Sequence, residues 1–114
     1  MTDIARRLED DLASTQRLIV DLESDLEAIA ESTALSPDDE HDPEGATVGF
    51  ERARVASLLD QTRRSLMDIE SALLRVEGGS YGVCDRCAAP IAAERLEALP
   101  TTALCIECAA RSDR

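Results

Sequence analysis

With 114 residues, the chain is long enough for one small domain but too short to bury a large hydrophobic core, and only 2% of its residues are aromatic. Its net charge is −12, and fourteen of its 24 acidic residues lie in residues 1–47 against three arginines. Such a surface repels nucleic-acid phosphates, which argues against direct DNA or RNA binding and favours a basic protein surface as the partner.

The first predicted element is a long amphipathic helix over about residues 3–33. Asp and Glu fill its outer positions, and Pro37 predicts its end, because the residue before a proline disfavours the helical conformation. At 1.5 Å per residue the helix would be roughly 45 Å long. Its inner positions recur at alternating intervals of three and four residues, the heptad pattern of a coiled-coil seam: Ile4, Leu8, Leu12, Thr15, Ile19, Leu22, Leu26 and Ile29.

Residues 36–47 are predicted to form an acidic tip between two helices. Pro43 and Gly45 indicate a bend before Thr47, which we expect to cap the second helix. On composition alone this tip would be a solvated polar turn, and the lone His41 lacks the partners that a metal ligand needs. The acidic side chains of the tip are Asp38, Asp39, Glu40, Asp42 and Glu44.

A second helix is predicted over about residues 48–77, ended by Gly78 and Gly79. Two helices of matched length with one apolar seam each predict an antiparallel coiled-coil hairpin over residues 1–77. The alternative is that each seam pairs with another molecule. The second seam consists of Val48, Val55, Leu59, Thr62, Leu66, Ile69, Leu73 and Val76.

Residues 78–114 contain the four cysteines of the chain, in two Cys-x-x-Cys pairs: Cys84 with Cys87, and Cys105 with Cys108. This spacing is typical of a four-thiolate zinc site. Four thiolates leave no open position for water, so the predicted Zn²⁺ is structural. Two disulfides or a thiol redox motif are the alternatives. No apolar run of signal-peptide length follows the first residues and no stretch is long enough to span a membrane, so we expect reduced cysteines and a soluble, cytoplasmic protein.

The pattern around these cysteines resembles the DksA/TraR family of bacterial zinc-finger transcription regulators. The resemblance is strongest over residues 73–108 and looser through the predicted hairpin. Besides the four cysteines, the matching residues are Gly79, Tyr81, Gly82, Pro90, Ile91, Arg95, Leu96 and Pro100.

The resemblance implies that the protein binds RNA polymerase rather than promoter DNA. In this family the coiled coil enters the secondary channel of the polymerase, and acidic residues at its tip modulate initiation. The family's tip pattern is Asp-x-x-Asp-x-Ala. Counting back from Cys84 without gaps places His41, Glu44 and Ala46 there, which we favour, whereas a shift of two residues places Asp39, Asp42 and Glu44 there.

Two departures from the family pattern concern regulation and local geometry. Family members that act with the alarmone ppGpp use basic residues where this chain has Gln61, Asp68 and Ala109, so we expect little or no synergy with ppGpp. Ala88 stands where the family usually has glycine, which would strain the backbone if that position needs a positive φ. Arg95 belongs to the matched segment, and we expect it to be structural or to contact the polymerase.

Two function classes follow from the sequence. The first is a monomeric regulator that binds RNA polymerase through its secondary channel. The second is a zinc-stabilised coiled-coil adaptor or dimerisation protein with another basic partner. An enzyme is not expected, because the zinc has no free position and no nucleophile-base pair is apparent.

Overall fold

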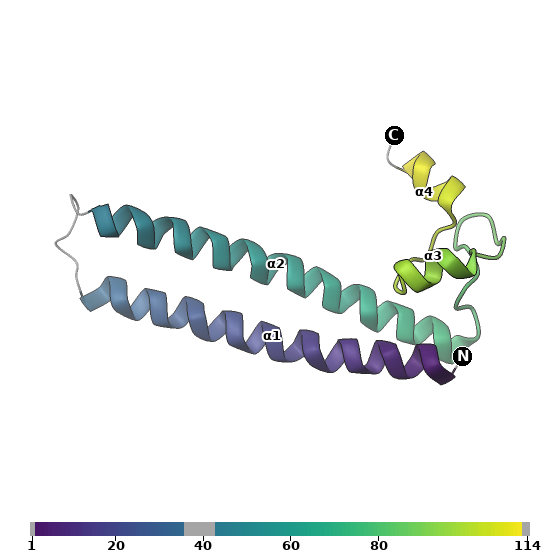
Figure 1. Cartoon of the computed structure of the whole chain (residues 1–114), viewed down its shortest axis with the longest axis horizontal. Helices are drawn as coiled ribbons and strands as arrows, with labels where there is room; N and C mark the ends of the chain where they lie inside the picture. Colours follow the sequence, from purple (N-terminus) through teal and green to yellow (C-terminus); the bar gives the residue numbers. More distant parts are fainter. Residues whose placement is uncertain (1, 36–42, 113–114) are drawn as a thin grey trace. The chain divides into compact units, whose positions relative to one another are not determined.

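The computed structural model describes residues 2–35 and 43–112 and is mainly α-helical in these ranges (Figure 1). Its helices follow in the order α1 (Thr2–Leu35), α2 (Pro43–Gly78), α3 (Ala93–Ala98) and α4 (Ile106–Ser112). Val83 and Pro90 form an isolated antiparallel bridge between α2 and α3. No helix in the described ranges is both long and apolar enough to cross a membrane. The predicted fold class, a helical hairpin followed by a small four-cysteine module, is confirmed.

The chain divides into two compact units. The middle unit comprises Ser14–Ser65, and the terminal unit comprises Met1–Ala13 together with Leu66–Arg114. Both units contain part of α1 and part of α2. The predicted division of the chain into a hairpin, residues 1–77, and a zinc-finger module, residues 78–114, stays a prediction.

In the middle unit, α1 and α2 pair through the predicted seam. Leu22, Val55 and Leu59 are buried at 7%, 2% and 4% exposure, and Ile19, Leu26 and Ile29 pack against them. Each of these aliphatic side chains stabilises the folded unit by removing apolar surface from water. An exposed ion pair of 3.0 Å joins Arg63 on α2 to Glu23 on α1, but pairs of this kind add little stability.

In the terminal unit, the same two helices pack through a separate cluster. Its buried members are Leu8, Ala72 and Tyr81, and partly buried side chains pack around them: Ile4, Leu73, Val76 and Leu96. Ala72 is fully buried although it was not assigned to the predicted seam. Because alanine is small, α1 and α2 can pack together at this position, which a second large residue beside Leu73 would prevent.

The start of α2 corrects the predicted boundary. The helix begins at Pro43, ahead of the expected start at about residue 48, so residues 43–47 are helical rather than part of a loop. Proline is tolerated in the first turn because its missing N–H would have no partner within the helix there.

The end of α2 is set by glycine, as predicted. Gly79 has a φ of 80°, which L-residues rarely adopt. This conformation lets the N–H of Ser80 donate to the carbonyl of Arg75 at 2.9 Å and that of Gly79 donate to Val76 at 3.3 Å. The pair of bonds is a Schellman motif, which satisfies carbonyls at the end of the helix.

Candidate metal centre

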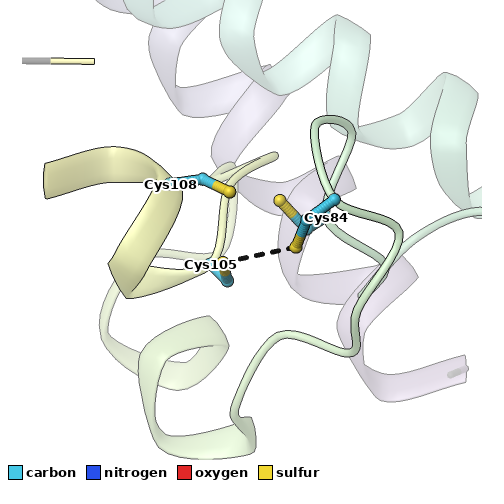
Figure 2. A group of neighbouring side chains, drawn as sticks. Cys84, Cys105 and Cys108 are labelled. Atoms are coloured by element: carbon cyan, nitrogen blue, oxygen red, sulfur yellow. Dashed lines mark hydrogen bonds between the residues drawn. The ribbon is translucent and has the colours of Figure 1, made fainter. Parts of the chain in front are cut away.

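The four cysteines come together in one cluster of the terminal unit. Their Sγ atoms all lie within 4.8 Å of one another. Figure 2 shows Cys84 opposite Cys105 and Cys108, with the sulfurs turned towards a common space. Cys84 and Cys108 are buried at 2% and 4% exposure, whereas Cys87 is exposed. The structure therefore brings together all four predicted ligands.

The sulfur spacing fits a metal site better than disulfides. The Sγ atoms of Cys87 and Cys105 are 3.7 Å apart. Zinc-sulfur bonds of about 2.3 Å in tetrahedral geometry require sulfurs roughly 3.8 Å apart, whereas a disulfide requires about 2.0 Å. All four cysteines are free thiols in this structure. The geometry favours the closed zinc site over the two disulfides considered as an alternative.

Backbone hydrogen bonds shape the first cysteine pair into a tight knuckle. The N–H of Cys84 donates to the carbonyl of Ala89 at 2.8 Å, and the N–H of Ala88 donates back to the carbonyl of Cys84 at 2.9 Å. Just outside, the N–H of Ile91 donates to the carbonyl of Gly82 at 2.8 Å. The chain thereby reverses, and two cysteines three positions apart reach one metal ion.

Ala88 occupies the position where positive φ was in question. Its φ is 62°, the one positive value among the non-glycine residues that the structure describes. In this left-handed conformation the Cβ atom crowds the backbone, at a cost of roughly 1–2 kcal/mol relative to glycine. The expected strain at this knuckle is confirmed.

The second pair is positioned by α4. Cys105 directly precedes the helix, its carbonyl accepts the N–H of Ala109 at 2.9 Å, and Cys108 lies in the first turn. A further bond from the N–H of Asp85 to the carbonyl of Ala103, 2.8 Å long, joins the first knuckle to the segment before Cys105. The two pairs are therefore held together by the backbone as well as by the sulfurs.

A small apolar cluster surrounds the buried sulfurs. Cys84 and Cys108 pack with buried Ile91, and the partly buried Leu96, Leu104 and Cys105 close around them. This packing keeps water from two of the four ligands. It also makes the metal site the core of the module, which suits a structural rather than a catalytic ion.

Arg95 supports the segment that leads to the second pair. Its Nε donates to the carbonyl of Leu104 at 2.9 Å, and its Nη2 lies 3.5 Å from Oγ1 of Thr102. The Thr102 hydroxyl in turn donates to the Leu104 carbonyl at 3.2 Å. These contacts support the structural role expected for Arg95, and its contact with polymerase stays a prediction.

The two buried thiols differ in acidity. Backbone N–H groups, first that of Cys105 and then that of Cys87, lower the pKa of Cys84 to about 6. The Cys108 thiol donates to Cys105 and is buried, so its pKa is raised to about 12. A cluster that holds a thiolate at neutral pH beside three further sulfurs has the donor set that Zn²⁺ prefers.

The predicted tip residues are only partly within the described ranges. Asp39 and Asp42 lie outside them. Glu44 and Ala46 lie in the first turn of α2. Of the residues that bear on ppGpp, Gln61 and Asp68 are exposed on α2.

Sequence reasoning missed the residues that hold the end of α3 and the segment after it. Arg7 on α1 donates to the carbonyl of Glu97 at 3.0 Å, and Arg75 on α2 donates to that of Thr101 at 2.9 Å. Their partners are main-chain carbonyls, which every residue has, so no spacing in the sequence could have identified them.

Comparison with known proteins assigns the cluster to a described type. Residues 79–114 match the family model described as a prokaryotic dksA/traR C4-type zinc finger. With the four converging sulfurs, this match identifies the cofactor as one structural Zn²⁺, as predicted.

Several known proteins are similar to this chain. The RNA polymerase-binding transcription factor DksA of Caulobacter vibrioides is 41% identical over 64 residues, 56% of this chain and 45% of that protein. The uncharacterized protein YteA of Bacillus subtilis is 43% identical over 67 residues, 59% of this chain and 28% of that protein. The chain thus spans less than half the length of these curated relatives. The solved structure of transcription factor DksA2 from Pseudomonas aeruginosa superposes with a TM-score of 0.58 at 25% identity, covering 95% of this chain and 84% of that chain.

Proposed function

We propose that this chain, a member of the DksA/TraR family of C4-type zinc-finger proteins, is a transcription regulator that acts by binding RNA polymerase. The observation that carries the proposal is the similarity of this chain to a protein named as an RNA polymerase-binding transcription factor, together with the C4 zinc-finger match of residues 79–114. The closed four-cysteine site agrees with it, because such a site stabilises a fold and offers no position for a substrate. We accordingly propose a cytoplasmic, non-enzymatic protein.

Charge supports a polymerase surface as the partner rather than nucleic acid. The net charge is −12. The carboxylates of α1 are exposed on the described residues, apart from half-buried Asp11, which gives a basic protein surface an acidic face to bind. Duplex phosphates would be repelled by the same face. The exposed members are Asp3, Glu9, Asp10, Asp21, Glu23, Asp25, Glu27 and Glu31.

For the mechanism we propose that the hairpin enters the secondary channel and that its acidic tip modulates initiation. The helical start of α2 at Pro43 supports the ungapped register, because an unbroken helix from Glu44 onwards needs no insertion. We place Glu44 and Ala46 at the acting positions and Asp42 beside them. In the shifted register, Asp39, Asp42 and Glu44 take those positions.

We further propose that ppGpp adds little to the effect. The positions that would meet its phosphates carry Gln61, Asp68 and Ala109, none of them a cation.

The second candidate is a zinc-stabilised adaptor that dimerises through its seams. The clusters around Leu22 with Val55, and around Leu8 with Ala72, use both seams within one chain. This arrangement favours a monomer over an adaptor dimer, since few seam positions remain for a second copy.

Co-purification from its own cell extract tests the proposal. The regulator should be monomeric by light scattering and should retain core RNA polymerase subunits, whereas the adaptor should be a stable dimer that retains other proteins. A matched bait in which Cys84 and Cys87 are serine should lose zinc and polymerase together. Failure of the wild-type bait to retain polymerase would reject the proposed function.

A further inference from the structure

An open groove of about 630 Å³ lies between α3 and α4, beside the zinc site. Most of its lining is apolar, including Pro90, Leu99 and Ile106. Leu99 and Ile106 are 50% and 69% exposed, so two large aliphatic side chains of one hollow face solvent. Contiguous exposed apolar surface of this kind marks protein contact sites.

The walls of the groove are fixed before any partner arrives. Cys87 and Cys105 line it, so the zinc site joins the knuckle on one side to the start of α4 on the other. Arg95, which also lines it, is bonded to the carbonyl of Leu104. A preformed surface loses little conformational freedom on binding, which favours affinity.

The charges of the groove select the partner. Glu94 and Glu107 line it and are both exposed, against the single cation Arg95 among the lining residues. Two of the three guanidinium nitrogens of Arg95 already donate within the chain. The formal charge of the groove is negative, so phosphates of nucleic acid or lipid are repelled and basic side chains are attracted.

We infer that this groove is a docking surface for a segment of RNA polymerase that presents an aliphatic side chain between lysines or arginines. The aliphatic side chain covers Leu99 and Ile106, and the flanking cations face Glu94 and Glu107. This inference rests on the proposed function and adds to it a contact separate from the acidic tip. The groove supplies affinity, whereas the tip changes initiation.

The test measures the affinity of purified core RNA polymerase for four variants, each checked first for zinc content and melting temperature. Leu99→Gln should weaken binding about tenfold, as loss of an anchoring contact does. Val83→Gln is the control, because Val83 is 40% exposed, lies outside the hairpin and does not line the groove. Its affinity should equal that of the wild type. Ile106→Gln should resemble Leu99→Gln, and Glu94→Gln with Glu107→Gln should lower the affinity and its dependence on salt.

The outcomes separate this inference from the proposed function. Wild-type affinity in Leu99→Gln would overturn the groove while leaving polymerase binding in place. An equal loss in Val83→Gln would also overturn it, because the effect would not depend on the groove. If the wild-type protein did not bind core polymerase at all, both proposals would fall. Should Ile106→Gln lose zinc through its position between two ligands, Leu99→Gln decides.

Discussion

The hydroxyl of Tyr81 donates a hydrogen bond of 2.7 Å to the main-chain carbonyl of Pro100. The ring of the same residue is buried at 8% exposure against Leu8 and Ala72. Tyr81 thus links the pairing of α1 and α2 in the terminal unit to the segment that runs from α3 towards Cys105. A single side chain connects the helical core with the approach to the metal site.

Replacing Tyr81 with phenylalanine tests this link. The ring packing is retained, but the half-buried carbonyl of Pro100 loses its donor, which costs about 1–2 kcal/mol of unfolding free energy. Urea unfolding followed by circular dichroism measures the change. Thr101→Ala is a suitable control, because it keeps the main-chain carbonyl that accepts from Arg75. Equal stability of Tyr81→Phe and wild type would show that the hydrogen bond is not needed.

The titration of Tyr81 should report the same environment. Burial raises the pKa of its phenol above the usual 10.0, with Arg75 and Arg7 acting in the opposite direction. Because the folded pKa exceeds the unfolded one, the neutral phenol contributes stability that is complete below pH 10 and is lost as the pH rises through the folded value.

Tyr81 is the only tyrosine and the chain has no tryptophan, so near-ultraviolet absorbance follows this one group. We expect the midpoint of the Tyr81 titration to lie at a higher pH in the folded protein than in the protein unfolded in urea. A midpoint in the folded protein at or below the unfolded one would contradict the buried placement.

Arg95→Ala should weaken the metal site although no ligand is altered. The carbonyl of Leu104 would lose the Nε donor, at a cost of about 1–3 kcal/mol. Competition with a coloured chelator should therefore show faster and more complete zinc loss than in the wild type. Arg111→Ala, on an exposed residue of α4, serves as the control for loss of positive charge. Unchanged zinc retention in Arg95→Ala would leave a direct contact with polymerase as the better account of this residue.

Ala88→Gly should strengthen the site. Glycine relieves the left-handed strain of about 1–2 kcal/mol at a φ of 62°, but it adds about 0.4–1 kcal/mol of unfolded-state entropy. The balance favours the variant by about 0.5–1 kcal/mol, or a two- to fivefold gain in apparent zinc affinity, since metal binding and folding are coupled.

The neighbouring change Ala89→Gly is the matched control, because Ala89 has no positive φ to relieve. It should lower the apparent zinc affinity. A lower affinity in Ala88→Gly as well would mean that the knuckle does not need the left-handed conformation.

Sequence periodicity was sufficient to predict most of this fold. All of the predicted seam residues are buried or half-buried, from Ile4 to Ile29 on α1 and from Val48 to Val76 on α2. The reason is physical, because a heptad pattern predicts which face of a helix is buried. The predicted start of α2 is wrong because Pro43 and Gly45 indicate a bend, whereas proline also fits the first turn of a helix, where α2 begins.

The surroundings of the zinc site were less predictable than its ligands. Cysteine spacing predicted the four zinc ligands. The family's usual glycine at the position that Ala88 occupies indicated the positive φ found there. The sequence predicted a structural or polymerase-contacting role for Arg95 and only a family match for Tyr81, and it could not name their partners, because these are the main-chain carbonyls of Leu104 and Pro100. The groove could not be predicted, since Leu99 and Ile106 come together only once the two cysteine pairs meet.

Transcription by purified RNA polymerase is the most direct test of the central proposal. The double variant Asp42→Asn with Glu44→Gln keeps the size of both side chains and removes their charges. We expect the wild-type protein to change initiation, and the double variant to bind polymerase with nearly unchanged affinity but to lose that effect, with or without ppGpp. An effect of the double variant equal to that of the wild type would contradict the role of the acidic tip.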